Sequence, residues 1–434
     1  MSARRSVKVG LLGLGVVGGG VARILAEKRD RYAAELGCPL ELARVLVRDP
    51  EKERSVAIDP ALFTTDAGAV LDDPEIDVII EVMGGEEPAF RYAREALQAG
   101  KYVVTGNKEV MAKHGAALLA LARERGVDVL YEASVGGGIP IIAPLKRDLL
   151  ANDIVAISAI INGTTNYILT AMSREGRDFA EALSQAQALG YAEPDPANDV
   201  EGVDAAYKLA ILASLAFHGE VRPEQVYREG ITRLAARDFR YARELGYAIK
   251  LLAIARRLPD NSGVQMRVHP AMLPDDEPLA KVDGVLNAVQ VEGDLLGRTL
   301  FEGQGAGSLP TTSAVVADLL DAAHSVVTGV RERLSWSGEV PLRVAPMGEL
   351  RTKYYLRLTI TDQPGVLAQI ARVLGDAEIS IASVLQKEAD EEARTAELVI
   401  MTHESKEASM QEALRLVEAL PVVTAIGTFL RVEG

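Results

Sequence analysis

The sequence predicts an α/β protein with a doubly wound parallel sheet, an α+β middle section and a compact C-terminal unit. In residues 1–134, short apolar runs alternate with helical segments. Near-continuous apolar strands between helices indicate a parallel sheet covered on both faces. From residue 353 onward, the predicted order strand, helix, strand, strand, helix, strand is typical of ferredoxin-like folds. Between these parts, a strand, a polar turn and long helical segments are expected, through about Leu258.

The helices and strands expected in the first third of the chain fit the predicted α/β class. A helix is expected over residues 16–36, and another from Pro88 that ends with Gly100 as its C-cap. Strands are expected at the start of Val7–Gly15, and over Leu40–Asp49, Ile76–Gly85, Lys101–Asn107 and Val127–Ser134.

Composition limits the classes of function. A length of 434 residues is typical of two or three domains. The formal net charge of -15 argues against nucleic acid and anionic membranes as partners, because both attract basic surfaces. The single cysteine, Cys38, excludes a disulfide within one chain and a cysteine-based metal cluster. A reducing, cytoplasmic location fits this cysteine usage.

A glycine-rich turn follows the first expected strand and precedes a helix. Its residues are Gly13, Leu14, Gly15, Val16, Val17 and Gly18, a G-x-G-x-x-G pattern. In this context the pattern predicts a Rossmann-type dinucleotide-binding domain. Gly13 permits the tight turn, Gly15 lets the backbone approach a pyrophosphate, and Gly18 allows close packing of helix on strand. A plain strand–helix turn is the alternative.

Two further basic residues follow strands of the predicted sheet. Arg48 ends the second strand, where a guanidinium suits the 2′-phosphate of NADP, so NADP is favoured over NAD. Asp49 beside it leaves an ordinary solvated charge cluster open. Lys108 follows the fourth strand, where it can meet a cofactor or a substrate carbonyl. The alternative is a surface lysine at a helix start.

The stretch Gly190–Lys208 concentrates charge before an apolar helix. It holds the carboxylates Glu193, Asp195, Asp199, Glu201 and Asp204 and ends at Lys208. Asp204 and Lys208 are four residues apart and share a helix face. A lysine withdrawn from water can give a proton to an alkoxide, with Asp204 aiming it, while Glu193 accepts hydrogen bonds from a substrate amine or hydroxyl. A surface ion pair is the alternative.

Together these motifs resemble the homoserine dehydrogenases. The resemblance runs from the start of the chain to about Val330, and its motifs are GLGVVG, TGNKE, YEASVGGGIP, NGTTNYIL and the stretch Gly190–Lys208. The loop–helix sequence Asp362–Leu367 resembles an ACT domain. The resemblance implies reversible, nicotinamide-dependent reduction of L-aspartate 4-semialdehyde to L-homoserine, in the biosynthesis of threonine and methionine.

The resemblance also implies roles for individual residues. Lys208 is the proton donor and Asp204 its partner, Glu193 and Asp199 bind substrate, and Lys108 lies between cofactor and substrate. Gly305, in a return loop over Gly303–Gly307, lies against the cofactor. A monovalent cation, sodium in most members, is held by backbone carbonyls, although a glycine-rich turn without metal is the alternative. The cation ligands match Glu132, Val135, Gly137 and Ile139.

The resulting domain scheme has four parts. A dinucleotide-binding domain takes residues 1–134 plus 308–332, a substrate-binding and dimerisation domain 135–307, a linker 335–352, and a regulatory ACT domain 353–434. The resemblance implies an amino-acid effector, with threonine as the expectation, between paired ACT units. A homodimer or homotetramer is expected.

Two other functions would explain parts of the sequence. An aspartate-semialdehyde dehydrogenase that works through a thioester needs a cysteine nucleophile. Cys38 is the only candidate, and it lies in the loop before the second strand. A non-enzymatic regulator that senses a dinucleotide and an amino acid would explain both ends of the chain, but not the acidic stretch before Lys208.

Overall fold

The computed structural model describes residues 6–54, 56–330, 341–390 and 394–434. The chain divides into two compact units. Unit 1 comprises Met1–Ile157, Tyr207–Gln225 and Asn287–Leu342, and unit 2 comprises Ser158–Ala206, Val226–Leu286 and Arg343–Gly434.

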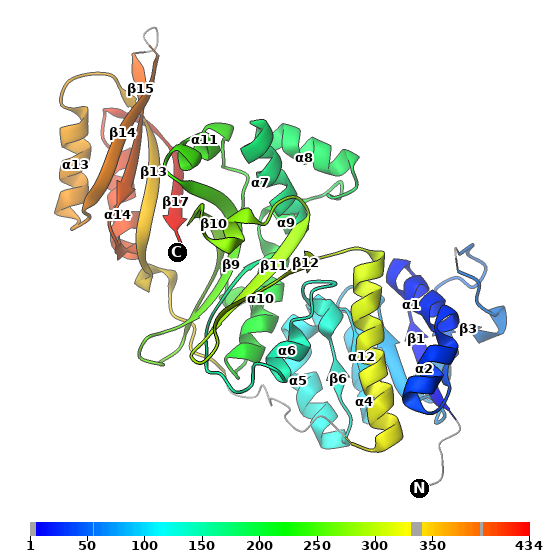
Figure 1. Ribbon diagram of the computed structural model, residues 1–434. Coiled ribbons are helices and arrows are strands. Elements are labelled where there is room, and N and C mark those ends of the chain that lie inside the picture. Colours follow the sequence, from blue (N-terminus) through cyan, green and yellow to red (C-terminus); the bar gives the residue numbers. More distant parts are fainter. Residues whose placement is uncertain (1–5, 55, 331–340, 391–393) are drawn as a thin grey trace. The chain divides into compact units, whose positions relative to one another are not determined.

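Unit 1 is built on the parallel sheet that the sequence predicts. Its neighbouring strands pair in parallel, as the doubly wound class requires (Figure 1). In spatial order the strands are β3 (Phe63–Thr64), β2 (Leu40–Leu46), β1 (Val7–Leu12), β4 (Val78–Glu81), β5 (Tyr102–Thr105) and β6 (Val129–Leu130). The expected fifth strand is short, because a 3-10 turn, η2 (Glu132–Ser134), replaces its second half.

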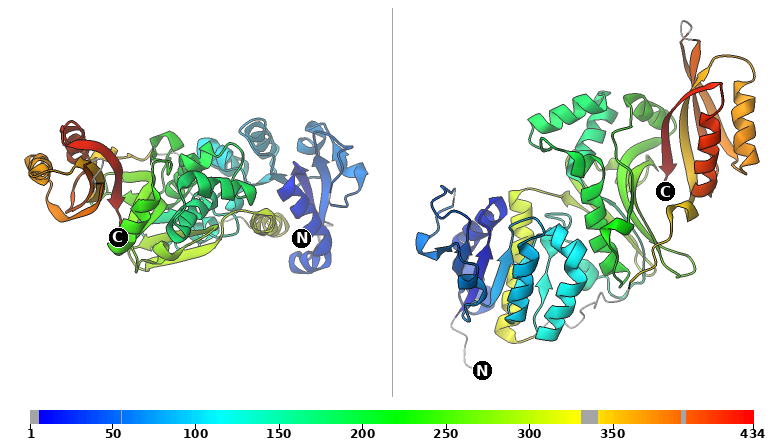
Figure 2. Two further views of the ribbon diagram at one scale, coloured as in Figure 1. Left: turned by 90° about the horizontal axis from the view of Figure 1, so that it is seen from above. Right: turned by 180° about the vertical axis from the view of Figure 1, so that it is seen from behind.

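Helices cover both faces of this sheet. α1 and α12 pack together on one face, and α4 and α5 pack together on the other (Figures 1 and 2). The expected helix over 16–36 is two helices, which meet at Lys28. The helices are α1 (Val16–Glu27), α2 (Arg29–Leu36), α3 (Gly68–Leu71), α4 (Ala89–Gln98), α5 (Lys108–Arg125), α6 (Ile142–Lys146) and α12 (Ser308–Thr328), with the 3-10 turns η1 (Pro60–Leu62) and η3 (Pro223–Gln225).

Three elements contain residues of both units. They are the strand β7 (Ile154–Ile160), the helix α10 (Val203–Ala216) and the strand β11 (Leu286–Gly293), whose first residue belongs to unit 2. Unit 1 also contains β12 (Gly297–Gln304) and residues 287–293 of β11.

Unit 2 begins with helices and continues with a long hairpin. The strand β9 (Tyr247–Arg257) pairs antiparallel with β10 (Val264–Pro274) along its whole length. The expectation of helical segments through about Leu258 holds as far as α11 and is wrong for β9. The middle of β9 is buried and mostly apolar, and such a short pattern does not distinguish a strand from a helix. The other elements are α7 (Gly163–Glu175), α8 (Phe179–Ala188), α9 (Ala197–Val200), β8 (Tyr227–Arg228), α11 (Ala236–Glu244) and η4 (Pro278–Lys281).

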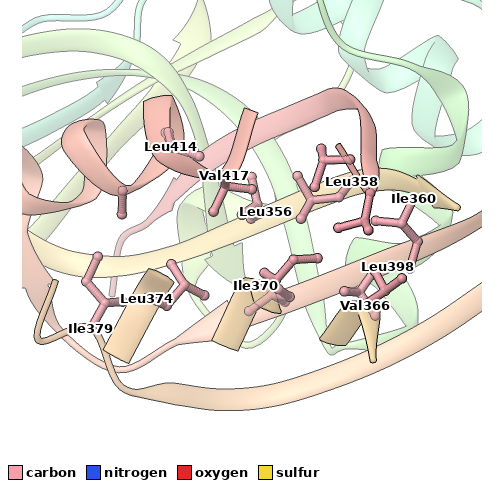
Figure 3. Close-up of a cluster of buried hydrophobic side chains, with 14 of the residues drawn as sticks. Leu356, Leu358, Ile360, Val366, Ile370, Leu374, Ile379, Leu398, Leu414 and Val417 are labelled. Atoms are coloured by element: carbon pink, nitrogen blue, oxygen red, sulfur yellow. The ribbon is translucent and has the colours of Figure 1, made fainter. Parts of the chain in front are cut away.

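The C-terminal part of unit 2 has the predicted strand and helix order. Its strands lie in the order β17 (Val423–Val432), β13 (Arg351–Thr361), β15 (Thr395–Thr402) and β14 (Ile381–Asp390). α13 (Val366–Asp376) and α14 (Glu407–Glu418) cover one face, and Leu356, Leu358 and Ile370 are part of the core between them (Figure 3). A short strand, β16 (Ser405–Lys406), pairs with the start of β13.

The second face of this C-terminal sheet carries a buried ionic cluster. Arg357 of β13 donates to Asp238 of α11, with Nε 2.6 Å from Oδ1, and to Glu397 of β15 at 3.1 Å. Thr428 and Tyr355 also donate to Asp238, whose side chain is fully buried. Because side chains alternate along a strand, β13 turns leucines to one face and Arg357 to the other.

A second ionic contact joins β17 to the middle section. Arg431, which is fully buried, donates to Glu229 at 3.0 Å and also to Glu407. β17 also pairs in parallel with β10. The C-terminal unit is thus joined to the middle section by strand pairing as well as by buried ion pairs.

Residues 335–340 of the expected linker lie outside the described residues. The rest of it contains a 3-10 turn, η5 (Met347–Glu349), and the start of β13. None of the helices in the described chain combines the length and apolarity that crossing a bilayer requires.

Replacing Arg357 by Met should lower the free energy of unfolding by about 3–5 kcal/mol, because it leaves the buried Asp238 without its cation, while Glu397 keeps its pair with Arg237. The measurement is the urea midpoint at constant slope, followed by circular dichroism. The control is Arg372→Met, which removes an exposed pair with Asp376 and should change stability by less than about 0.5 kcal/mol. Equal midpoints for the two variants would contradict the assigned role of the cluster.

Candidate active site

The glycine-rich turn in unit 1 has the geometry of a close strand–helix junction. Gly13 has a φ of +97°, which favours glycine. A Cβ on Gly18 would lie 2.1 Å from the carbonyl oxygen of Gly13, so helix α1 can approach the strand only with glycine there. Gly15 faces open space, since an added Cβ would meet no atom within 4 Å. Leu14 and Val17 are half-buried between them, and Val16 is exposed.

A buried acid supports the helix that begins with Lys108. Glu81, at the end of β4, accepts a hydrogen bond from the Thr105 hydroxyl at 2.7 Å, and burial raises its pKa. Thr105 Oγ1 in turn accepts from the backbone N–H of Asn107, whose side chain caps α5. Lys108 is the first residue of α5 and is exposed, as is Arg48 after β2. Both follow carboxyl ends of parallel strands, where doubly wound folds bind ligands.

The return loop packs backbone against backbone with the turn that follows β6. A Cβ on Gly137 would lie 2.5 Å from the carbonyl oxygen of Gly305. The N–H of Gly138 donates to the carbonyl of Gln304 at 3.0 Å. A Cβ on Gly305 would in turn lie 2.0 Å from the side chain of Asn287. Glycine at these positions lets the two segments touch.

The turn Glu132–Ile139 presents backbone oxygens that suit a hard cation. Within the described part of the chain, the carbonyl oxygens of Val135, Gly137 and Ile139 accept no hydrogen bond, although all three residues are buried. The Glu132 carbonyl accepts one long bond, 3.4 Å from the Val135 nitrogen. Oxygen ligands of this kind fit a monovalent alkali cation.

The side chain of Glu132 serves a different purpose from its carbonyl. Its carboxylate accepts hydrogen bonds from the backbone N–H groups of Ile141, Ile142 and Ala143, which begin helix α6. Its backbone N–H donates to Asp318 of α12 at 2.8 Å. Burial raises the pKa of Asp318 to about 8. The carboxylate of Glu132 thus holds the turn in place and is fully engaged in doing so.

In unit 2, one amide brings two of the expected site carboxylates together. Nδ2 of Asn162 donates to Asp199 of α9 at 2.7 Å and to Asp204 of α10 at 2.9 Å. Asp204 is buried, Asp199 is half-buried, and Glu193 is exposed on the loop before them. Asn162 therefore joins two carboxylates of the acidic stretch, whereas no contact joins the exposed Glu193 to them among the described residues.

Lys208 lies one turn after Asp204 on α10. It is half-buried, and the helix continues with the fully buried residues Leu209, Ala210, Leu212 and Ala213. Further along, α10 and α5 line one small cavity in unit 1, so the helix that carries Lys208 packs against the helix that begins with Lys108. Asp204 and Lys208 thus share the helix face that the sequence predicted.

Sequence reasoning missed three supporting residues: Asn162, Glu81 and Asp318. A pattern was available for Asn162, because an asparagine between a strand and a helix is typical of an N-cap, and Thr165 N–H does donate to it. Its two carboxylate partners lie 37 and 42 residues away, and no local pattern reveals them. Glu81 and Asp318 are single acids within apolar runs, and nothing in the sequence around them indicates which group they would bind.

Three family models match the chain, two of them for homoserine dehydrogenase and one for the ACT domain. Residues 13–132 match the NAD-binding domain of homoserine dehydrogenase, residues 140–320 match homoserine dehydrogenase itself, and residues 354–422 match the ACT domain. A homoserine dehydrogenase of Pseudomonas aeruginosa is 43% identical over 434 residues, which cover 99% of each chain. The non-enzymatic alternative is not favoured by these matches.

Solved structures agree with the sequence relatives. The crystal structure of a homoserine dehydrogenase from Thiobacillus denitrificans has a TM-score of 0.92 and 43% identity, and covers 99% of this chain and 98% of its own. A hyperthermophilic archaeal homoserine dehydrogenase in complex with NADPH has a TM-score of 0.62 and 28% identity, and covers 73% of this chain and 97% of its own. With this agreement over nearly its full length, the chain belongs to the homoserine dehydrogenase family.

Proposed function

We propose that Lys208 is the proton donor of this enzyme, with Asp204 as its positioning partner. The enzyme is an NAD(P)-dependent oxidoreductase that interconverts L-aspartate 4-semialdehyde and L-homoserine. The observation that carries the proposal is the geometry of α10, where a buried, hydrogen-bonded Asp204 stands one helical turn before a half-buried Lys208. A carboxylate at this spacing lies on the same helix face as the lysine, within reach of its ammonium group.

A nicotinamide cofactor, when bound, would supply the hydride. As the aldehyde carbon is reduced, negative charge grows on its oxygen, and the ammonium of Lys208 stabilises that charge and then gives up a proton. Lys108, at the start of α5, adds a second positive charge. In the reverse direction the neutral amine of Lys208 takes the hydroxyl proton of homoserine.

The acidic stretch provides the binding groups for the substrate amine. Asp199 and Glu193 carry negative charge, and an ammonium group favours such acceptors. Asn162 holds Asp199 and Asp204 through one amide, so it positions a substrate-binding carboxylate and the partner of the proton donor together. We expect Asn162 to act through these two residues, as a positioning residue.

The cofactor site is proposed for the glycine turn and the residues around it. Gly13, Gly15 and Gly18 bring the N-terminus of α1 to the pyrophosphate, whose charge favours the positive end of the helix dipole. Arg48 is exposed after β2, where it can pair with a 2′-phosphate, and this supports NADP over NAD. Gly305 closes the site from the return loop.

A sodium ion is proposed at the carbonyl oxygens of Glu132, Val135, Gly137 and Ile139. Three of these oxygens accept no hydrogen bond within the described chain, which is costly for buried polar groups unless an ion or a water molecule is bound to them. The ion would stiffen the turn that packs against Gly305. No proton or hydride step passes through it.

The remaining proposals concern regulation and setting. The ACT domain supports feedback control by an amino acid, with threonine as the first candidate. We also propose the domain boundaries given above, a homodimeric or homotetrameric assembly and a cytoplasmic location. Size-exclusion chromatography with light scattering tests the assembly directly.

Lys208→Ala should lower kcat by about two to four orders of magnitude, because a lost general acid has that effect. KM for aspartate semialdehyde should change much less. The assay is NADPH oxidation on addition of aspartate semialdehyde. The control is Lys281→Ala, a lysine on the surface of unit 2. Near-normal turnover in Lys208→Ala would refute the assignment.

Arg48→Ala should raise KM for NADPH about tenfold or more, since it removes a charge-assisted contact to the 2′-phosphate. KM for NADH should stay within about twofold, because NADH lacks that phosphate. Arg29→Ala, an exposed arginine of α2, serves as the control. If Arg48→Ala affects both cofactors equally, the preference for NADP has another origin.

The glycine turn can be dissected with two alanines. Gly15→Ala should leave the unfolding midpoint unchanged, because its Cβ enters open space, yet weaken cofactor binding by blocking the pyrophosphate. Gly18→Ala should lower both the unfolding midpoint and the affinity for the cofactor, because its Cβ collides with the Gly13 carbonyl. Thermal unfolding and fluorescence titration with NADPH separate the two effects. The control is Gly375→Ala, at an exposed helix position. Tight NADPH binding by Gly15→Ala would argue against the turn as the phosphate site.

A further inference from the structure

Unit 1 contains a buried carboxylate that no step of the proposed reaction uses. Glu81 is the last residue of β4 and is fully buried. Its backbone pairs with Leu12 of β1 on one side and with Thr105 of β5 on the other. Because β1 leads into the glycine turn and β5 leads into Lys108, Glu81 stands between the two strands that precede these parts of the site.

Four neighbouring groups donate hydrogen bonds to the side chain of Glu81. Its Oε1 accepts from the N–H of Met83 at 2.8 Å, and its Oε2 accepts from the hydroxyl of Thr105 at 2.7 Å. Burial raises the pKa of this carboxyl, and these two hydrogen bonds, with others from Asn107 and Gly84, oppose the rise. An amide of the same shape offers one accepting oxygen in place of two, so these donors select a carboxylate.

The first route from Glu81 leads through Thr105 to the start of α5. The hydroxyl of Thr105 gives its proton to Glu81 and accepts from the N–H of Asn107 at 3.0 Å. Asn107 in turn caps α5, since its Oδ1 accepts from the N–H of Val110 at 3.2 Å, and all three side chains of this route are buried. Because Lys108 directly follows the cap, the route fixes the backbone from which its side chain extends.

The second route leads through Met83 to the glycine turn. A Cβ on Gly13 would lie 3.1 Å from the carbonyl oxygen of Val82 and 3.2 Å from the Cα of Met83. The segment after β4 therefore packs directly on the turn. Glu81 holds this segment through the N–H of Met83, so it also limits where the turn can lie.

We propose that Glu81 is a positioning residue, which acts on cofactor binding through Met83 and on turnover through Lys108. The amide of Asn107 joins the two routes, since its Nδ2 donates to the carbonyl of Gly85 at 2.7 Å. A group displaced from the reacting centre costs rate even when its own chemistry is intact. The turnover part of this inference rests on the role proposed for Lys108.

The experiment compares two substitutions of Thr105 in the full-length enzyme. Thr105→Val keeps the shape of the side chain but removes its hydroxyl, so kcat should fall about tenfold or more while the Kd for NADPH stays within about twofold. Thr105→Ser keeps the hydroxyl and should keep kcat near the wild-type value. Stopped or steady-state NADPH oxidation gives kcat, and fluorescence titration gives the Kd.

The matched control is Thr402→Val, at the buried end of β15. The hydroxyl oxygen of Thr402 accepts from the N–H of Tyr354 at 3.1 Å, as that of Thr105 accepts from a backbone N–H. This control should lower the urea midpoint as Thr105→Val does, but leave kcat unchanged. Loss of stability alone would therefore not imitate the expected result.

Glu81→Gln should affect both routes, because its amide turns one accepting oxygen into a donor. The Kd for NADPH should rise about tenfold, and kcat should fall as it does in Thr105→Val. An unchanged Kd would overturn the route through Met83. Thr105→Val leaves the carboxylate in place, so it tests the route to Lys108 even where Glu81→Gln does not fold.

A double variant separates this inference from the role proposed for Lys108. If Thr105 acts through Lys108, Thr105→Val should lower kcat little further in a Lys108→Met enzyme, because residues that act as a unit are not additive. Additive losses would overturn the inference, and so would normal kcat in Thr105→Val beside slow turnover in Lys108→Met. Normal turnover in Lys108→Met would overturn the role proposed for Lys108 itself.

Discussion

One amide group holds the acidic stretch of this enzyme in place. Asp199 and Asp204 approach the same side chain, and two carboxylates so close repel each other unless donors compensate. Asn162 supplies both N–H groups of its amide, one to each carboxylate. Its oxygen cannot exchange places with its nitrogen, because that oxygen accepts from the Thr165 N–H and caps α7. The helix cap thereby decides the direction in which the two donors point.

This constraint extends along α10 and α9. Since Asp204 is fixed to the start of α7, the first turn of α10 is fixed as well, and the helix then determines where Lys208 stands. On the other side, α9 is bonded to the segment after β8, whose Glu229 pairs with the buried Arg431 of the ACT part. Each link is a polar contact that is buried or half-buried, and breaking it leaves at least one polar group poorly solvated. The acidic stretch is therefore built into unit 2 and is more than a solvated loop.

The sequence was sufficient for the elements whose pattern is local. Alternating apolar residues on β13 and a 3.6-residue period on α13 revealed the ferredoxin-like order, and a glycine pattern between strand and helix revealed the cofactor turn. Two features had no local signal. β9 is apolar on both faces, so a strand could not be told from a helix. The partners of Asn162 and Arg357 lie far along the chain, and long-range polar pairing leaves no periodicity to detect.

Glycines at the contact explain how the turn after β6 can pack against the return loop in the proposed cofactor region. The turn after β6 and the return loop are separated by more than 160 residues, yet Gly138 N–H bonds to the Gln304 carbonyl. Any side chain at Gly137 would strike the Gly305 carbonyl, and any at Gly305 would strike Asn287. The turn that carries the proposed cation site and the return loop of the proposed cofactor site are therefore packed directly against each other, backbone on backbone. A methyl group at Gly137 must displace the backbone of the return loop, whereas a methyl group at Gly305 must displace the buried side chain of Asn287.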